Sequence, residues 1–186
     1  MKRVLIIYDS RLGAVEKMAR LIARGVEQVS GCEAVLRRVP GGDEHSDAIA
    51  DIEDLQSCDA LIMGSPTRFG NMSHRLKAFL DSTSSLWMSG TLVDKPAAVF
   101  TSSSSMHGGQ ESTLLSMQLP LMHHGMILVG LPFTLDAVKK TTSGGSPYGA
   151  THVAGVSNAN PVTEDEKTLC RALGKRVAEL ALKLST

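Results

Sequence analysis

Residues 61–81, LIMGSPTRFGNMSHRLKAFLD, decide the fold of this chain. The apolar run at residues 61–63 is typical of a strand, and it breaks at a Gly-Ser-Pro turn. A loop follows at residues 67–72, and Ser73 then caps a segment whose apolar residues recur at helical spacing. Ligands of open α/β sheets bind beyond the carboxyl ends of the strands, so this loop is the first candidate for a functional site.

The same alternation of strand and helix recurs along the chain. Apolar runs predict strands at residues 4–8, 34–39, 60–64, 97–101 and 126–131. Periodicity predicts helices at residues 15–26, 73–83, 110–124 and 163–184, the last with a capping box at Thr163 and Glu166. Within the polar segment 43–54 we expect a loop and a short helix over Ile49, Ile52 and Leu55. The prediction is α/β, a flavodoxin-like doubly wound five-stranded parallel sheet of order 2-1-3-4-5 with helices on both faces.

Two segments show no such periodicity. Residues 84–90 are expected to form a loop that exposes Trp87, the only tryptophan. Residues 132–161 form a long irregular connection, and a structureless connection of this length inside a domain is more often functional than not.

Length and composition restrict the class of protein. We expect residues 1–186 to form a single domain. Lys plus Arg and Asp plus Glu number 19 each, so net charge favours neither nucleic acid nor an anionic membrane surface as a partner. The three cysteines fit neither a disulfide framework nor a metal site. No apolar run is long enough for a signal peptide or a membrane span, and we therefore expect a cytoplasmic protein.

The loops after the first, third and fourth strands should converge at one edge of the sheet. They carry hydroxyl groups at Ser10, Thr67 and residues 102–105, and glycines that permit close backbone approach. Such loops suit a phosphate held by neutral donors and a helix dipole. Neither a GxGxxG dinucleotide fingerprint nor a Walker loop is present, so a mononucleotide such as FMN is the leading ligand.

Five short motifs, in order along nearly the whole chain, carry a family resemblance. They are the loop after the first strand, PTRFGNM at residues 66–72, GGQE at 108–111, HHG at 123–125 and GSPYGA at 145–150. Together they resemble the tryptophan-repressor-binding-protein type of NAD(P)H:quinone oxidoreductase, an FMN enzyme of flavodoxin fold.

The resemblance implies specific site residues. Its cofactor-binding residues would be Ser10, Arg11, Leu12, Gly13, Ala14 and Val15 around the ribityl phosphate, Pro66, Thr67, Arg68, Phe69, Gly70 and Asn71 along the isoalloxazine, and Ser102, Ser103, Ser104, Ser105 and Gly108 over its other edge. It also implies that Trp87 and His123 face the flavin from an adjoining subunit of a homotetramer or homodimer. Phe69, Trp87 and His123 would then bind substrate, with His123 as the catalytic residue that contacts a quinone oxygen.

This chain departs from the family pattern at three places. Leu12 replaces an aromatic residue that the family uses against the nicotinamide, and Ala14 replaces a common histidine. The connection after the second strand is shorter than usual. The serine loop is longer and holds Met106 and His107 where glycines and a threonine are usual.

These observations lead to one function hypothesis and two alternatives. The first is an FMN enzyme that uses NADH or NADPH to reduce a quinone by two electrons in a ping-pong cycle, with no metal. The second is a flavodoxin-type electron carrier, although the long segment 132–161 exceeds what a carrier needs. The third is a flavin-binding regulatory protein without turnover.

Overall fold

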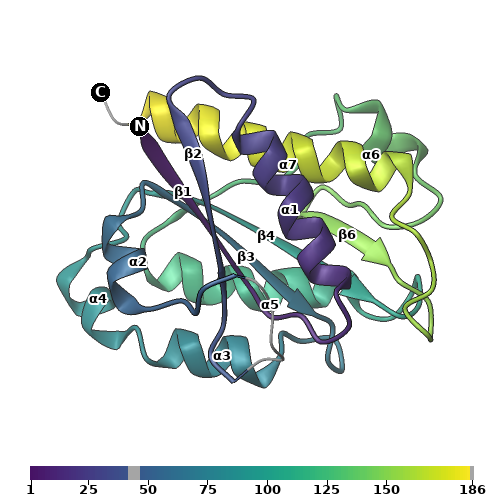
Figure 1. Cartoon of the computed structure of the whole chain (residues 1–186), viewed down its shortest axis with the longest axis horizontal. Coiled ribbons are helices and arrows are strands. Elements are labelled where there is room, and N and C mark those ends of the chain that lie inside the picture. The colour runs from purple at the N-terminus through teal and green to yellow at the C-terminus, as the bar shows by residue number, and fades with distance from the viewer. Residues whose placement is uncertain (42–46, 185–186) are drawn as a thin grey trace.

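The strands of the described residues all lie in one parallel sheet, seen edge-on and strongly twisted in Figure 1. The computed structural model describes residues 1–41 and 47–184. The strands are β1 (Lys2–Tyr8), β2 (Cys32–Arg38), β3 (Ala60–Pro66), β4 (Pro96–Ser103), β5 (Ile127–Leu128) and β6 (Ala150–Val153). The helices are α1 (Ala14–Val26), α2 (Ile52–Ser57), α3 (His74–Asp81), α4 (Ser84–Ser89), α5 (Gln110–His123), α6 (Asp136–Lys140) and α7 (Glu164–Lys183). The order β2-β1-β3-β4-β5 confirms the predicted topology.

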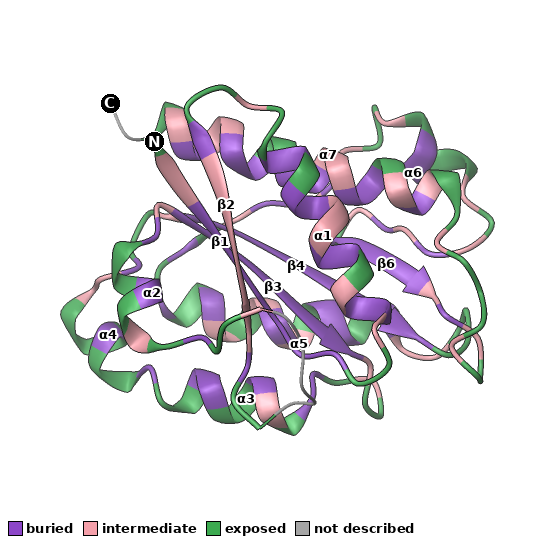
Figure 2. Cartoon of the chain, in the orientation of Figure 1, coloured by how far each residue is buried: buried purple, intermediate pink, exposed green. Residues whose placement is uncertain are grey.

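Helices cover both faces of the sheet because the central strands are apolar on both faces. Val4 and Ile6 of β1 pack with α1 and α7, whereas Leu5 and Ile7 pack with α3 and α5. Figure 2 shows β1, β3 and β4 buried along nearly their whole length, while the edge strand β2 is only half-buried. The continuous apolar runs of the central strands follow from this burial on two sides.

Two glycines allow α1 and α7 to cross closely on one face. A Cβ atom added to Gly174 would lie 2.1 Å from the Ile22 carbonyl oxygen, and one added to Gly25 would lie 2.0 Å from the Arg171 carbonyl oxygen. Backbone atoms cannot move aside as a side-chain tip can, so this crossing requires glycine at both positions.

The predicted fifth strand at residues 126–131 was wrong beyond Leu128. The chain leaves the sheet there, and Leu131 donates its N–H to the Pro147 carbonyl at 2.9 Å instead of to β4. The following Pro132 has no N–H group for a sheet hydrogen bond. After α6 the chain returns as β6, which pairs with residues 100–103 of β4. The edge position beside β4 is therefore shared by β5 and β6, and the segment 132–161 is not structureless.

The predictions of where the other helices begin, and of the loop before β4, were partly correct. Ser73 caps α3 and the Thr163–Glu166 capping box opens α7, as predicted. The predicted loop at residues 84–90 was wrong, because residues 84–89 form α4. The short helix after β2 begins only at Ile52, since Asp51 caps it and Ile49 is extended in a bridge to Arg38. The first part of that predicted segment, residues 43–46, lies outside the described residues.

Candidate functional site

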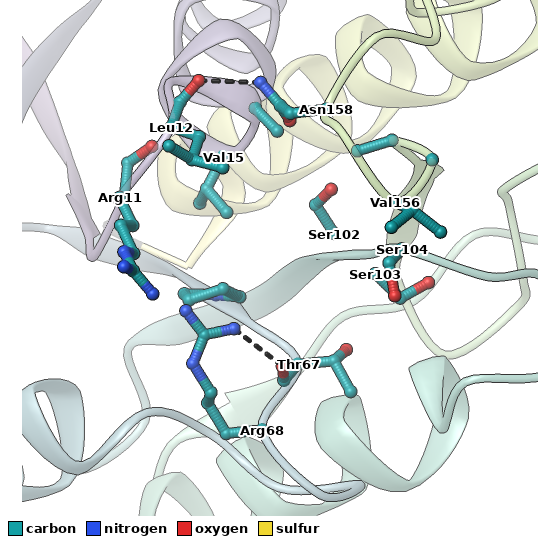
Figure 3. Close-up of a pocket in the computed structure, with 15 residues that line it drawn as sticks. Arg11, Leu12, Val15, Thr67, Arg68, Ser102, Ser103, Ser104, Val156 and Asn158 are labelled. Atoms are coloured by element: carbon teal, nitrogen blue, oxygen red, sulfur yellow. Dashed lines mark hydrogen bonds between the residues drawn. The ribbon is translucent and has the colours of Figure 1, made fainter.

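The candidate site is a cavity of about 240 Å³ beyond the carboxyl ends of β1, β3, β4 and β6. Figure 3 shows its lining side chains approaching from separate loops. They are Ser10, Arg11, Leu12, Ala14, Val15, Pro66, Thr67, Arg68, Ser102, Ser103, Ser104, Ala154, Gly155, Val156 and Asn158. Three predicted loops therefore meet, and a fourth joins them.

The loop between β1 and α1 presents an open helix N-terminus to the cavity. Gly13, the N-cap residue, has φ of 84° and has no side chain that could cap the first turn of α1. The helices α3 and α7, by contrast, begin with a side-chain cap from Ser73 and Thr163. Ser10 Oγ accepts the Glu16 N–H at 3.3 Å and ties the loop to the helix. Free N–H groups at the start of a helix, with the positive end of its dipole, form a binding site for an anion.

The loop between β3 and α3 is a tight turn that presents Phe69 to solvent. Arg68 and Asn71 exchange two backbone hydrogen bonds of 2.8 and 2.9 Å. The two residues between them have positive φ, 51° at Phe69 and 72° at Gly70, as in a type I′ turn. A phenylalanine rarely adopts this conformation, and here its side chain is fully exposed (108%). The turn therefore holds an aromatic ring away from the core at a conformational cost.

Hydrogen bonds fix the base of this turn against β4. Thr67 donates its N–H to the Ser102 carbonyl at 2.9 Å. Thr67 Oγ1 lies 3.2 Å from Thr101 Oγ1, and Thr101 donates its own hydrogen to the Ser65 carbonyl at 2.7 Å. Thr67 is therefore the donor to Thr101, and its hydroxyl has a set direction.

Glycines let the turn pack directly on the start of α5. A Cβ atom on Gly109 would lie 2.8 Å from Gly70 Cα, so the two backbones touch. Gln110, the first residue of α5, donates to Ser103 Oγ at 2.8 Å, and Ser103 donates to the Ser105 carbonyl at 2.7 Å. These contacts order the serine loop, in which Ser105 and Gly108 are not part of the cavity lining.

The fourth loop, which follows β6, was missed from the sequence. It contributes Ala154, Gly155, Val156 and Asn158 to the cavity. Asn158 Nδ2 donates to the Leu12 carbonyl at 2.7 Å and bridges this loop to the β1–α1 loop, as Figure 3 shows. The Gly-Val-Ser-Asn run at residues 155–158 is typical of a turn. Because β6 was not predicted, there was no reason from the sequence to place this turn at the carboxyl edge of the sheet.

A buried carboxylate anchors the fourth loop. Glu166, with no exposed surface, accepts the Val153 N–H at 3.1 Å and the Gly144 N–H at 2.8 Å. His152 Nδ1 lies 2.9 Å from its other oxygen. Burial alone would raise the pKa of Glu166, but the hydrogen bonds from His152, Thr163 and Gly144 outweigh it and lower the pKa to about 2. A charged carboxylate thus joins β6, the segment before it and α7.

Several predicted site residues lie elsewhere. Gly13, Phe69, Gly70, Asn71, Ser105 and Gly108 belong to the site loops but do not line the cavity. Trp87 and His123 line a second cavity of about 420 Å³ between the ends of α3, α4 and α5. It lies at the other end of α5, a helix of 14 residues, which is about 20 Å long. Within one chain, Trp87 and His123 are therefore remote from the first cavity.

His124, in the second cavity, has a defined tautomer. Thr83 Oγ1 donates to the Leu80 carbonyl at 2.7 Å, so His124 Nε2, 2.9 Å away, must donate to Thr83. Its Nδ1 is then a bare acceptor, buried and without a partner among the described residues. Burial, and next the neighbouring His123, lower the pKa of His124, which favours this neutral form. Within residues 1–41 and 47–184, no three His, Cys, Asp or Glu side chains are grouped to hold a metal ion.

Comparison with known proteins identifies the family. Residues 3–139 match the NADPH-dependent FMN reductase family. The chain belongs to this family. Two relatives named NAD(P)H dehydrogenase (quinone), from Syntrophobacter fumaroxidans and Geobacter sulfurreducens, are each 44% identical to it over 98% of both chains. A solved flavodoxin, WrbA-like protein from Agrobacterium tumefaciens has a TM-score of 0.73 at 26% identity, over 98% of this chain and 99% of that one.

For a member of the FMN reductase family, the expected cofactor is FMN, as the sequence predicted, and the chemistry is NAD(P)H-dependent oxidoreduction. The resemblance to a family of NAD(P)H:quinone oxidoreductases is likewise confirmed. Among the helices of the described chain, none is both long and apolar enough to cross a membrane.

The residues of the cavity fit FMN. The N-terminus of α1, which begins after Gly13, and the Ser10 hydroxyl suit its phosphate, because both offer donors to an anion. Leu12 and Val156, 64% and 93% exposed, present apolar surface to the same cavity. Apolar walls with few directed polar groups are the usual lining of a site for a flat aromatic ring.

Proposed function

We propose that this protein binds FMN in the four-loop cavity and uses NADH or NADPH to reduce a quinone by two electrons in a ping-pong cycle. The open N-terminus of α1, which faces the same cavity as the Thr67–Arg68 turn, carries the proposal. It places the phosphate-binding end and the ring-binding end of one mononucleotide in a single cavity. The name of the relatives agrees with this enzyme class.

Bound FMN would supply the hydride chemistry, and the chain would supply position and charge. In this proposal the first turn of α1 holds the phosphate, while the turn after β3 borders the ring. The N–H groups of Thr67 and Arg68 are already bonded within the protein. Negative charge on a reduced ring would therefore be stabilised by the Arg68 guanidinium, which lines the cavity.

A single mouth serves both substrates in this proposal. The exposed side chains of Leu12 and Val156 both line the cavity, and the proposal needs no second passage to it. The pyridine nucleotide would leave before the quinone enters, which is the physical basis of a ping-pong cycle. Hydride transfer between two bound rings needs no dedicated acid or base.

The test is direct. Purified protein given FMN should turn yellow with a fixed stoichiometry of one per chain. NADH or NADPH should then bleach the flavin without a quinone, and continuous oxidation of the nucleotide should require benzoquinone. Initial rates at several fixed benzoquinone concentrations should give parallel double-reciprocal lines. Protein that binds no FMN, or that oxidises neither nucleotide with benzoquinone, would refute the proposed function. Converging lines would refute the ping-pong order alone.

We also propose that the protein is a homotetramer or homodimer in which Trp87 and His123 reach the cavity of an adjoining subunit. The outer face of α5 carries an apolar stripe, Leu115, Leu119 and Met122, that is 46–60% exposed. With Trp87 beside it, this stripe is typical of a protein interface. Light scattering should show an assembly, and Leu119→Glu should dissociate it. In the same assembly, His123→Ala should raise the KM for benzoquinone if His123 contacts a quinone oxygen.

An electron carrier is the second candidate, because solved flavodoxins share this fold, including flavodoxin 2 from Bacillus cereus with a TM-score of 0.67 at 21% identity. A carrier would bind FMN but would need a separate reductase to oxidise NAD(P)H. Turnover by the purified chain alone therefore separates the two. We further propose a cytoplasmic location, which the three free, buried cysteines support.

A further inference from the structure

Two arginines converge on the cavity, and neither pairs with a carboxylate in the described part of the chain. Arg11, from the β1–α1 loop, and Arg68, from the turn after β3, both line it and both are exposed. In Figure 3 their guanidinium groups point toward one another along one side of the cavity. None of the 15 lining residues is acidic, and among the described residues neither guanidinium has a carboxylate partner.

The Arg11 charge lies away from the phosphate end of the cavity. Its side chain runs from the loop toward Arg68 and away from Val15 in the first turn of α1 (Figure 3). Arg68 is held in place because its Nη1 donates to the Thr67 carbonyl at 3.0 Å. The paired charges thus lie at the side where the turn after β3 borders the cavity. Two cations that converge with no anion between them repel each other, and an anionic ligand relieves this repulsion.

We propose that Arg11 and Arg68 bind a phosphate group of the pyridine nucleotide, so that this chain holds its electron donor by charge. This inference rests on the proposed function. Leu12, which neighbours Arg11 and also lines the cavity, can offer a nucleotide only an aliphatic contact. The two guanidinium groups offer the stronger contact, because hydrogen bonds between guanidinium and phosphate are short and charge-assisted.

The experiment compares Arg11→Gln with Arg24→Gln in FMN-loaded protein. Arg24 is an exposed arginine in the last turn of α1, outside the cavity, so both variants remove one positive charge from the same part of the chain. Binding of the redox-inert NADP⁺ and NAD⁺ is measured by calorimetry, and FMN affinity by fluorescence quenching. We expect Arg11→Gln to raise the Kd of the nucleotide about tenfold, the lower end for a hydrogen bond to a charged group. Arg24→Gln should leave the Kd of the nucleotide unchanged.

Two further measurements complete the expected result. The Kd of the wild type should rise more steeply with salt than that of Arg11→Gln, because one screened contact is absent in the variant. An equal loss for NAD⁺ and NADP⁺ assigns the contact to the diphosphate that both share, and a loss for NADP⁺ alone assigns it to the 2′-phosphate. Arg11→Lys, which keeps the charge, should recover part of the affinity.

Three results would overturn the inference. The first is the same nucleotide affinity in Arg11→Gln and Arg24→Gln. The second is an equal loss of FMN affinity in Arg11→Gln, which would assign Arg11 to the flavin phosphate. The third is a raised KM for a sulfonated quinone with unchanged nucleotide binding, which would assign the charge to an anionic acceptor. In each case, wild-type turnover of NAD(P)H with benzoquinone would leave the proposed function standing, whereas its absence would refute that function separately.

Discussion

Glu166→Gln removes the charge of a buried carboxylate while preserving its shape, and we expect it to destabilise the fold strongly. The pKa of Glu166 is about 2 instead of the ordinary 4.5. At 1.36 kcal/mol per pKa unit, this difference corresponds to about 3 kcal/mol of folding stability. Both carboxylate oxygens of Glu166 accept hydrogen bonds, one from the Gly144 and Val153 N–H groups and the other on the side of His152 and Thr163. The N–H₂ group of a glutamine would have to replace one of these oxygens, and it would then face donors instead of acceptors.

The contribution of Glu166 to folding stability should depend on pH in one direction. Because the folded pKa is lowered, the charged carboxylate stabilises the fold fully above about pH 4.5, and this contribution is lost as pH falls toward 2. Urea unfolding at pH 7 should therefore show a loss of about 3 kcal/mol in Glu166→Gln. The difference from the wild type should shrink as the pH is lowered below 4.5. FMN affinity should fall as well, since Val153 leads directly into the fourth loop.

Glu164→Gln is the matched control. Glu164 occupies the same first turn of α7 and pairs with Lys167 at 2.6 Å, but its side chain is 85% exposed. Both substitutions remove one negative charge near the start of the same helix, so a macrodipole effect would appear in both. If the two variants unfold at the same urea concentration, the role assigned to the buried carboxylate is refuted.

Three further predictions concern other parts of the fold. Phe69→Asn should raise Tm, because asparagine adopts positive φ at a cost lower by about 1 kcal/mol. It should also raise the KM for benzoquinone. An unchanged Tm would argue against strain in the turn. Gly174→Ala should cost at least about 2 kcal/mol in urea unfolding, since its Cβ would meet the Ile22 carbonyl. Gly13→Ala meets no atom within 4 Å and should cost only the strain of a positive φ, about 1 kcal/mol. Burial raises the pKa of the Cys170 thiol, so iodoacetamide should modify Cys170 only after unfolding, and labelling of the native protein at neutral pH would contradict this.

The central sheet and three of the four site loops could be predicted because their signals are local. Apolar runs such as residues 4–8 mark strands buried on two faces, and Ser73 and Thr163 mark the helix starts that they cap. The order of the strands then follows from the few topologies that parallel connections allow. The loops at Ser10, Thr67 and Ser102 therefore had to meet at one edge.

The sequence by itself thus determined the flavodoxin-like sheet and the chemistry that its loops offer to FMN. Only the tertiary structure decided that β6 takes the edge position beside the C-terminal half of β4 and brings Val156 and Asn158 into the cavity. It also decided that Arg11 points toward Arg68. The physical reason is the same in both cases. A four-residue strand and the direction of an exposed side chain depend on partners distant in sequence, and no local pattern of residues encodes those contacts.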